Sequence, residues 1–381
     1  MHEFIFHNPT KIDFGKGREQ HIGQHLADHH ITKVLLTFGS DRIKKDGLFD
    51  TVVASLTEHN IAYVELGGIV SNPVMSKVYE GIELAKAETV DAVLSVGGGS
   101  VLDSAKAIAA GVKYAGDAWD LFIGKGAVTA ALPIFDILTL AATGSEMNSG
   151  AVVTNETTKQ KFAINSPFTF PKVSVVNPEL MKTISRDYLV YSAADIIAHS
   201  IEGYFTATEQ PKLQSRLVET NIKTVIETTE ILLENPNDYD ARAEFAWAAT
   251  LALNGLTYAG TAGFSYPNHM IEHSLSALYN VPHGAGLSVI MPAWMKWYRH
   301  KNPEQFKRFG KEIFGGTADE GIAHLEAWFD KIGTPTRLSQ FEIDASEINR
   351  IKENVAGNAQ YFGIADIYTD EVITKILLDA L

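Results

Sequence analysis

The chain has 381 residues, of which 45% are hydrophobic and 20% are charged, and its net charge is −14 at pH 7. This length and composition predict a globular protein with two domains, and the acidic balance argues against nucleic acid or an anionic membrane surface as partners, because both attract basic faces. The absence of cysteine excludes disulfides, thiolate nucleophiles and cysteine-ligated zinc.

The cellular location is predicted from the N-terminus and from the apolar runs. Residues 1–6 lack the basic start and apolar core of a signal peptide. No apolar run approaches the length of a membrane span. Because a chain without cysteine also fits a reduced compartment, we expect a cytoplasmic protein.

The first part of the chain alternates β-rich runs with helical patterns. Strands are expected at 34–38, 62–66 and 92–96, and helices at 42–56 and 78–87. Strands that alternate with helices predict a parallel sheet covered on both faces. A β-hairpin is expected next, with strands 151–154 and 162–164 joined by the turn 155–159.

Beyond Pro178 the pattern becomes helical. Long amphipathic segments are expected as helices at 192–205, 212–233, 239–258 and 303–314. The sequence therefore predicts an α/β domain with a parallel sheet at 1–180. An all-α domain is predicted at 181–381.

A glycine-rich segment, Gly97-Gly98-Gly99-Ser100, follows the apolar strand 92–96 and opens a helical pattern. Glycines let the backbone approach a pyrophosphate, and the free amides of a new helix point at it. Ser100 and Asp103 have the spacing of a capping box. The alternative is a tight turn without a ligand. The segment is not G-x-G-x-x-G, so it differs from the standard Rossmann fingerprint.

A second glycine-bearing turn, Gly39-Ser40-Asp41-Arg42, closes the strand 34–38. If the cofactor is a dinucleotide, its adenosine ribose would be read here. Gly39 leaves room for a 2′-phosphate, Ser40 offers a donor, and Arg42 offers a fork that matches phosphate. The turn favours NADP, whereas Asp41 keeps NAD open. The alternative is a plain surface turn.

Four residues predict a metal site. Asp195 and His199 are one helical turn apart in an apolar stretch, and His269 and His283 follow later in the chain. One carboxylate and three imidazoles suit Fe²⁺ or Zn²⁺. A lone buried histidine is usually a satisfied core residue, but these apolar flanks would leave polar groups in need of a partner.

Another histidine cluster is interpreted differently. His21, His25 and His29 also have i,i+4 spacing, with His30 adjacent, but they lie among polar residues. We expect a solvated helix face there.

Taken together, the motifs resemble the iron-dependent (group III) alcohol dehydrogenase family, closest to its branch of NADPH-dependent aldehyde reductases and butanol dehydrogenases. The resemblance spans the chain from Phe6 onward. The motifs that carry it are Gly97-Gly98-Gly99-Ser100-Val101-Leu102-Asp103, Thr143-Gly144-Ser145-Glu146-Met147-Asn148, Asp195-Ile196-Ile197-Ala198-His199, Pro267-Asn268-His269-Met270-Ile271-Glu272-His273 and Pro282-His283-Gly284.

This resemblance implies a Rossmann-like, dinucleotide-binding α/β domain at 1–180 and a metal-binding helical domain at 181–381. It also implies an active site in the cleft between them, and a homodimer. It implies metal ligation by Asp195, His199, His269 and His283. The cofactor is expected, together with Gly39 and Ser40, at Asn72, Gly97, Gly98, Gly99, Ser100, Asp103, Thr139, Ser145, Val152, Lys161 and Leu180. His273 is expected near the nicotinamide and the substrate, as a proton relay or as a residue that only orients Glu272 or a ligand.

The expected reaction is hydride transfer between NAD(P)H and a small aldehyde or primary alcohol, with Fe²⁺ or Zn²⁺ bound. One alternative lies within the fold: a glycerol-type or sugar-phosphate dehydrogenase or lyase. Few Lys or Arg residues surround the ligand segments, which argues against a sugar phosphate. The other alternative is a metallohydrolase, for which Glu202 or Glu272 would have to act as the general base.

Overall fold

The computed structural model describes all residues, 1–381, and divides them into two compact units. One unit comprises His7–Thr183, and the other comprises Met1–Phe6 together with Ile184–Leu381. Compared with the expected division at residue 180, the first six residues join the helical unit, where the backbone N–H of His2 donates to Gly260 O at 2.9 Å. None of the helices is both long and apolar enough to cross a membrane.

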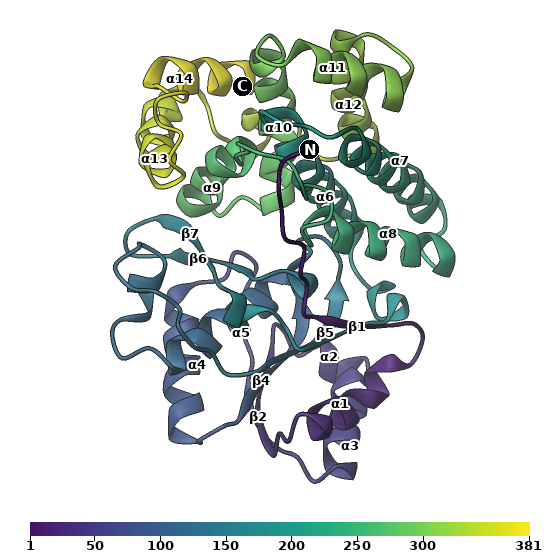
Figure 1. The fold of residues 1–381 in the computed structure, drawn as a ribbon, viewed down its shortest axis with the longest axis vertical. Helices are drawn as coiled ribbons and strands as arrows, with labels where there is room; N and C mark the ends of the chain where they lie inside the picture. The colour runs from purple at the N-terminus through teal and green to yellow at the C-terminus, as the bar shows by residue number, and fades with distance from the viewer. The chain divides into compact units, whose positions relative to one another are not determined.

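The α/β unit is built on a parallel sheet of six strands in the order β1-β8-β5-β4-β2-β3 (Figure 1). The strands are β1 Lys11–Phe14, β2 Lys33–Phe38, β3 Ala62–Leu66, β4 Ala92–Gly98, β5 Ile134–Leu140 and β8 Val173–Val176. The helices are α1 Ile22–Asp28, α2 Arg42–Lys45, α3 Leu48–Glu58, α4 Met75–Ala87 and α5 Gly99–Val112. The predicted α/β class with a parallel sheet is confirmed.

Both faces of this sheet are apolar, because alternate residues of each strand point to opposite sides. Leu35 and Val93 face one core, which they share with residues of α4 and α5. Val34 and Leu94 face the other core, which they share with residues of α1 and α3. The near-continuous apolar runs of the central strands follow from this double burial.

The expected helix at 42–56 is broken into α2 and α3. Gly47 lies between them with φ of +84°, a left-handed conformation that favours glycine and ends the first helix. The expected hairpin is confirmed as β6 Gly150–Asn155 paired with β7 Gln160–Asn165. Asn155 Oδ1 accepts from the backbone N–H groups of Thr157 and Thr158, which fixes the turn.

The second unit is helical, as predicted. Its helices are α6 Arg186–Thr206, α7 Lys212–Glu234, α8 Tyr239–Ala252, α9 Pro267–Tyr279, α10 His283–Tyr298, α11 Pro303–Phe309, α12 Ala318–Ile332, α13 Ile348–Tyr361 and α14 Asp370–Asp379 (Figure 1). Two predicted helices were too long. The segment 239–258 ends its helix at Ala252, and in 303–314 a π-helical turn replaces the α-helix from Gly310.

The interpretation of the histidines near residue 25 as a solvated face was wrong for His25. His25 is 6% exposed, and its Nε2 lies 2.7 Å from Asp13 Oδ2. Arg18 binds the same carboxylate, with Nη2 at 3.0 Å from Oδ2. The partner comes from β1, twelve residues earlier, so local spacing did not reveal the burial.

Candidate active site

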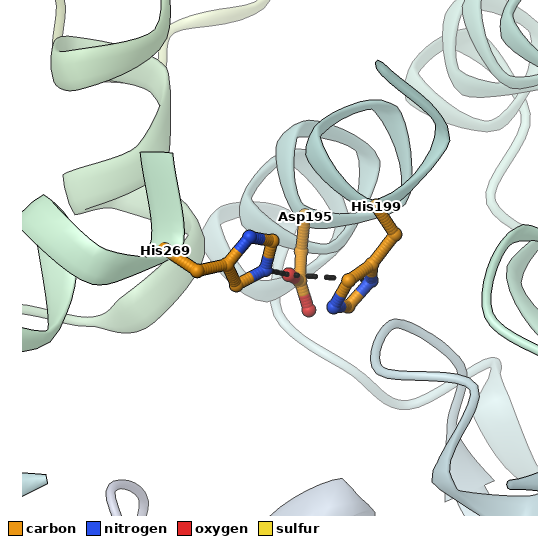
Figure 2. A group of neighbouring side chains, drawn as sticks. All are labelled: Asp195, His199 and His269. Atoms are coloured by element: carbon orange, nitrogen blue, oxygen red, sulfur yellow. Dashed lines mark ion pairs between the residues drawn. The ribbon is translucent and has the colours of Figure 1, made fainter. Parts of the chain in front are cut away.

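Helix α6 supplies two of the four predicted metal ligands. Its N-terminus is capped by Ser185, whose Oγ accepts from the backbone N–H of Tyr188 at 3.3 Å. Asp195 and His199 are one turn apart and both buried, so they project from the same face of the helix. Figure 2 shows their side chains directed toward each other and toward His269, which comes from α9.

The other two ligands depend on close packing of α9 and α10. His269 lies in the first turn of α9, and His283 is the first residue of α10. A Cβ on Gly284 would lie 2.0 Å from the backbone oxygen of Tyr191 in α6, and one on Gly286 would lie 2.8 Å from Glu272 in α9. Only glycine allows the start of α10, and therefore His283, to approach both helices so closely.

Asp195, His199 and His269 each offer a ligand atom within 4.8 Å of the others, and His283 approaches the same carboxylate from α10. His199 Nδ1 and His269 Nε2 each lie 3.6 Å from Asp195 Oδ1, and His283 Nε2 lies 3.7 Å from the same oxygen. These distances are too long for hydrogen bonds. Two ligands at about 2.1 Å from a tetrahedral ion are about 3.4 Å apart, so the spacing fits a shared cation.

Unpartnered buried atoms support that fit. Asp195 Oδ1, His199 Nδ1 and His269 Nε2 are buried without a hydrogen-bond partner. Leaving such groups unsatisfied costs about 1–3 kcal/mol each, and a common ion would satisfy all three. The donor set of one carboxylate oxygen and imidazole nitrogens suits Fe²⁺ or Zn²⁺.

The protonation of the cluster is shifted by burial and by mutual contact. Burial opposes ionisation of Asp195, but His199, His269 and His283 outweigh it and lower the pKa of that carboxyl. Burial lowers the pKa of His199 to about 3. Burial also works against a charged His269, but Asp195 and Glu202 raise its pKa to about 9. The site therefore holds an ionised carboxylate beside a neutral imidazole, both competent to bind a cation.

Two buried glutamates hold the outer nitrogens of two imidazoles. His269 Nδ1 lies 2.9 Å from Glu202 Oε1, and His283 Nδ1 contacts Glu272 Oε2. Glu202 also accepts from the backbone N–H of His269 at 3.0 Å. Since an ionised carboxylate only accepts, both Nδ1 atoms carry a proton, and both Nε2 atoms face Asp195. A cation bound there would displace the proton that the raised pKa of His269 keeps on its Nε2. In the sequence, both glutamates stood out only as possible bases of a hydrolase, and Glu272 also as a partner of His273. The H-x-x-E spacing at 199–202 and 269–272 was the one local signal, although each glutamate contacts an imidazole of another helix.

The predicted catalytic residue His273 lies beside this cluster, one turn after His269 on α9. It is buried, and its ring centre is 5.8 Å from that of His283 and 6.0 Å from that of Phe362. Its neighbour Glu272 is held by His283 and Ser276. His273 is close to the proposed ligands, and with Glu272 and His283 it forms a second group whose ligand-type atoms lie within 4.8 Å of one another.

The glycine-rich segment lies at the carboxyl end of β4. The strand continues through Gly98, and α5 begins at Gly99 without an intervening turn. A Cβ on Gly99 would lie 2.4 Å from Thr143 Oγ1, so the segment packs directly against residues that follow β5. No side chain caps the N-terminus of α5. The uncapped amides remain available to an anion.

The expected capping box of Ser100 and Asp103 was wrong, because the carboxylate of Asp103 is used elsewhere. Its Oδ1 accepts from Ser145 Oγ at 2.7 Å, and its Oδ2 accepts from the backbone N–H of Val152 at 2.9 Å. Asp103, Ser145 and Val152, all expected at the cofactor, are therefore joined by hydrogen bonds within the protein. This arrangement favours a role in shaping the site over direct contact with the ligand.

The remaining residues expected at the cofactor also lie in the α/β unit. Lys161 is 4% exposed, and its Nζ donates to Asn72 Oδ1 at 3.1 Å, so it is not a solvated surface charge. Thr139 is buried on β5, and Leu180 packs against the core beneath β2. Gly39 follows β2 without a carboxylate, and Ser40 is exposed.

Comparisons with known proteins agree with these features. Residues 9–178 match the family described as Iron-containing alcohol dehydrogenase, and residues 189–381 match Fe-containing alcohol dehydrogenase family, C-terminal. A relative from Bacillus subtilis, Probable NADH-dependent butanol dehydrogenase 1, is 37% identical over 98% of each chain. The NADPH-dependent aldehyde reductase YqhD of Escherichia coli is 34% identical over 91% of each chain.

Among solved structures, NADH-dependent butanol dehydrogenase A from Thermotoga maritima superposes with a TM-score of 0.97. It is 46% identical, and the match covers 100% of this chain and 99% of the other. Family matches to both parts and full-length relatives above 30% identity lead to one conclusion. The chain belongs to the iron-containing alcohol dehydrogenase family and is an oxidoreductase of the alcohol dehydrogenase and aldehyde reductase class.

Proposed function

We propose that this protein reduces small aldehydes to primary alcohols, and catalyses the reverse reaction, with NAD(P)H and one divalent Fe²⁺ or Zn²⁺. The observation that carries the proposal is the convergence of three imidazole nitrogens on Asp195 Oδ1 at 3.6–3.7 Å. Asp195, His199, His269 and His283 would hold the ion. When bound, such an ion supplies Lewis-acid polarisation of a carbonyl or hydroxyl oxygen.

The chain's own residues prepare that chemistry. Glu202 and Glu272 hold two imidazoles in one tautomer, so that their Nε2 atoms face inward. Apolar neighbours on α6 bury Asp195, which is 3% exposed. His273 is proposed to move a proton between the substrate oxygen and solvent. A change to Asn should then lower kcat without lowering the metal content, whereas a purely orienting His273 would show both losses.

The dinucleotide is proposed to lie along Gly97–Ser100, with its pyrophosphate at the N-terminus of α5. We propose NADPH over NADH, because the strand end at Gly39 has no carboxylate to repel a 2′-phosphate and Arg42 follows. Among the relatives, the butanol dehydrogenase from Bacillus subtilis is named as NADH-dependent and the aldehyde reductase YqhD as NADPH-dependent. The ratio of kcat/KM for NADPH to that for NADH measures the preference. A ratio that favours NADH would overturn this part of the proposal.

The metallohydrolase alternative loses support from the contacts of its two candidate bases. Glu202 and Glu272 are fully buried and each is bound to a ligand imidazole. A general base has to reach a water molecule near the substrate, and neither carboxylate is placed to do so. The homodimer and the cytoplasmic location remain predictions from the sequence.

The test follows NAD(P)H absorbance with butanal as substrate. Activity should disappear after treatment with a chelator and return with Fe²⁺ or Zn²⁺. Asp195→Ala should remain inactive under all these conditions while still binding the dinucleotide. Turnover that survives full removal of metal, or ester hydrolysis without loss of NAD(P)H, would contradict the proposal.

A further inference from the structure

Lys106 on α5 is buried completely, at 0% exposure. Its ammonium donates to the carbonyl oxygens of Ser145 at 2.7 Å and Gly150 at 2.8 Å, and to Ser145 Oγ at 2.8 Å. The carbonyl and side-chain oxygens of Asn148 lie at 2.9 and 3.3 Å. Lysine is rarely buried without such compensation. Here the compensation comes from five oxygen atoms of residues 145–150, which surround the ammonium of Lys106.

That segment, Thr143–Gly150, joins β5 to β6 and is called the 143–150 turn below. It contains only one short 3-10 helix, Ser145–Met147. Helix α5 holds it at two points, one turn apart. Lys106 binds its carbonyl oxygens, while Asp103 accepts from Ser145 Oγ and from the backbone of Val152 just beyond it.

The 143–150 turn is packed against the glycine-rich segment. The space above Gly99 is filled by Thr143, whose Oγ1 would lie 2.4 Å from an added Cβ. The same Oγ1 accepts from the backbone N–H of Ser145 at 3.2 Å. A shift of Ser145 would therefore move Thr143 across the start of α5.

We infer that Lys106 is a positioning residue. Its ammonium fixes the 143–150 turn, which holds Thr143 against Gly99 and so fixes the conformation of the proposed dinucleotide site. This inference rests on the proposed dinucleotide site at Gly97–Ser100. Lys106 does not touch the cofactor; it acts through Ser145 and Thr143. Neither the spacing of residues nor the family comparisons assign it this role.

The charge of Lys106 depends on its surroundings. Burial lowers the pKa of Lys106 to about 8, although three carboxylates oppose that shift: Asp103 on α5, Glu146 in the turn and Asp136 on β5. Protonated, the ammonium has three donors for the turn, and the neutral amine has two. Dinucleotide affinity should therefore fall as the pH rises from 7 to 9.

The experiment compares Lys106→Met, which removes the donors, with Lys106→Arg, which keeps the charge. Lys113→Met, the same change at the end of the same helix, is the control. Loss of hydrogen bonds from a charged group should raise the NAD(P)H dissociation constant about tenfold or more in Lys106→Met, while the metal content stays that of the wild type. Lys106→Arg should recover part of the affinity and lose the pH dependence.

Hydrogen exchange of the 143–150 turn provides a readout that does not need the cofactor. Exchange should be faster in Lys106→Met than in Lys113→Met. Unchanged exchange, or unchanged NAD(P)H affinity in folded Lys106→Met, would overturn the inference. If the wild type itself binds no dinucleotide, the proposed function fails, and the exchange measurement alone decides whether Lys106 fixes the turn. If Lys106→Met does not fold, NAD(P)H affinity and hydrogen exchange are both measured on Lys106→Arg instead.

Discussion

Two buried glutamates decide which nitrogen each of two imidazoles turns toward Asp195. Changing Glu202 or Glu272 to Gln replaces an obligate acceptor by an amide that can also donate, and the Nδ1 proton is no longer fixed. We expect each variant to bind Zn²⁺ about 10–100-fold more weakly. Competition with a chromophoric chelator measures this.

The matched control for that prediction is Glu244→Gln, an exposed glutamate on α8. It should bind Zn²⁺ as the wild type does. Equal affinities for Glu202→Gln, Glu272→Gln and Glu244→Gln would show that the two buried carboxylates do not support the ligands.

At the same scale, Asp13 has a pH-dependent role in stability. Burial alone would raise the pKa of Asp13, but Arg18 and His25 outweigh it and lower the pKa below the usual 3.8. A carboxylate with a lowered pKa stabilises the fold above its unfolded pKa, and this contribution disappears as the pH falls through the folded value. Asp13→Asn should therefore reduce the free energy of unfolding by about 1.5–3 kcal/mol at pH 7.

The difference between wild type and Asp13→Asn should be present at pH 5 and should shrink below pH 4. Urea unfolding at each pH measures it. Asp50→Asn, an exposed change on α3, should stay within about 0.5 kcal/mol of the wild type. A difference that grows toward low pH would refute the assignment.

Among the elements, α10 approaches α6 closely enough that only glycine fits at residue 284. Gly284→Ala would place a Cβ 2.0 Å from Tyr191 O and push the start of α10 away from α6. We expect a loss of about 1–3 kcal/mol in stability, as for overpacked cores, together with weaker metal binding because His283 moves. Thermal unfolding and a metal titration check the two effects.

Gly357→Ala on α13 is the control, since nothing lies within 4 Å of its added Cβ. It should stabilise the helix by about 0.5–1 kcal/mol. If Gly284→Ala behaved like Gly357→Ala, close packing would not be what places His283.

The elements also show where sequence reasoning succeeds and where it stops. The apolar runs of β2 and β4 and the turn at Asn155 are local signals, and they predicted the sheet and the hairpin. The break at Gly47 and the end of α8 at Ala252 depend on local conformation that periodicity does not encode. Partners far apart in sequence, such as Asp13 with His25 or Lys106 with Gly150, require the folded chain. The four ligands remain predictions from spacing, and Glu202 and Glu272 stood out in the sequence only as possible bases of an alternative hydrolase, because their contacts with His269 and His283 form only in the folded chain.

At the scale of the whole molecule, the metal and the dinucleotide are proposed to bind different units. Zn²⁺ at 100 times its dissociation constant should stabilise the chelator-treated protein by about 2.7 kcal/mol, and NADPH should stabilise it separately. Asp195→Ala should lose only the first effect. Gly98→Val, whose Cβ would lie 3.1 Å from Leu140 Cβ, should lose only the second.

Thermal unfolding with each ligand alone distinguishes these variants. The two losses should be independent, because the substituted residues belong to separate compact units. If both variants lost the same single stabilisation, two separate binding sites would be ruled out.

Residues 1–6 pack with the helical unit, although the chain then continues into the α/β unit. Phe4 and Met1 lie against Gly260, and His2 binds its carbonyl. Because domains generally fold as units during synthesis, we expect His7–Thr183 to fold before residues 1–6, whose partners around Gly260 are made much later. In nascent chains halted before residue 260, these six residues should therefore remain exposed to proteases and chaperones. Their exposure should end once Gly260 has been made and the helical unit has folded.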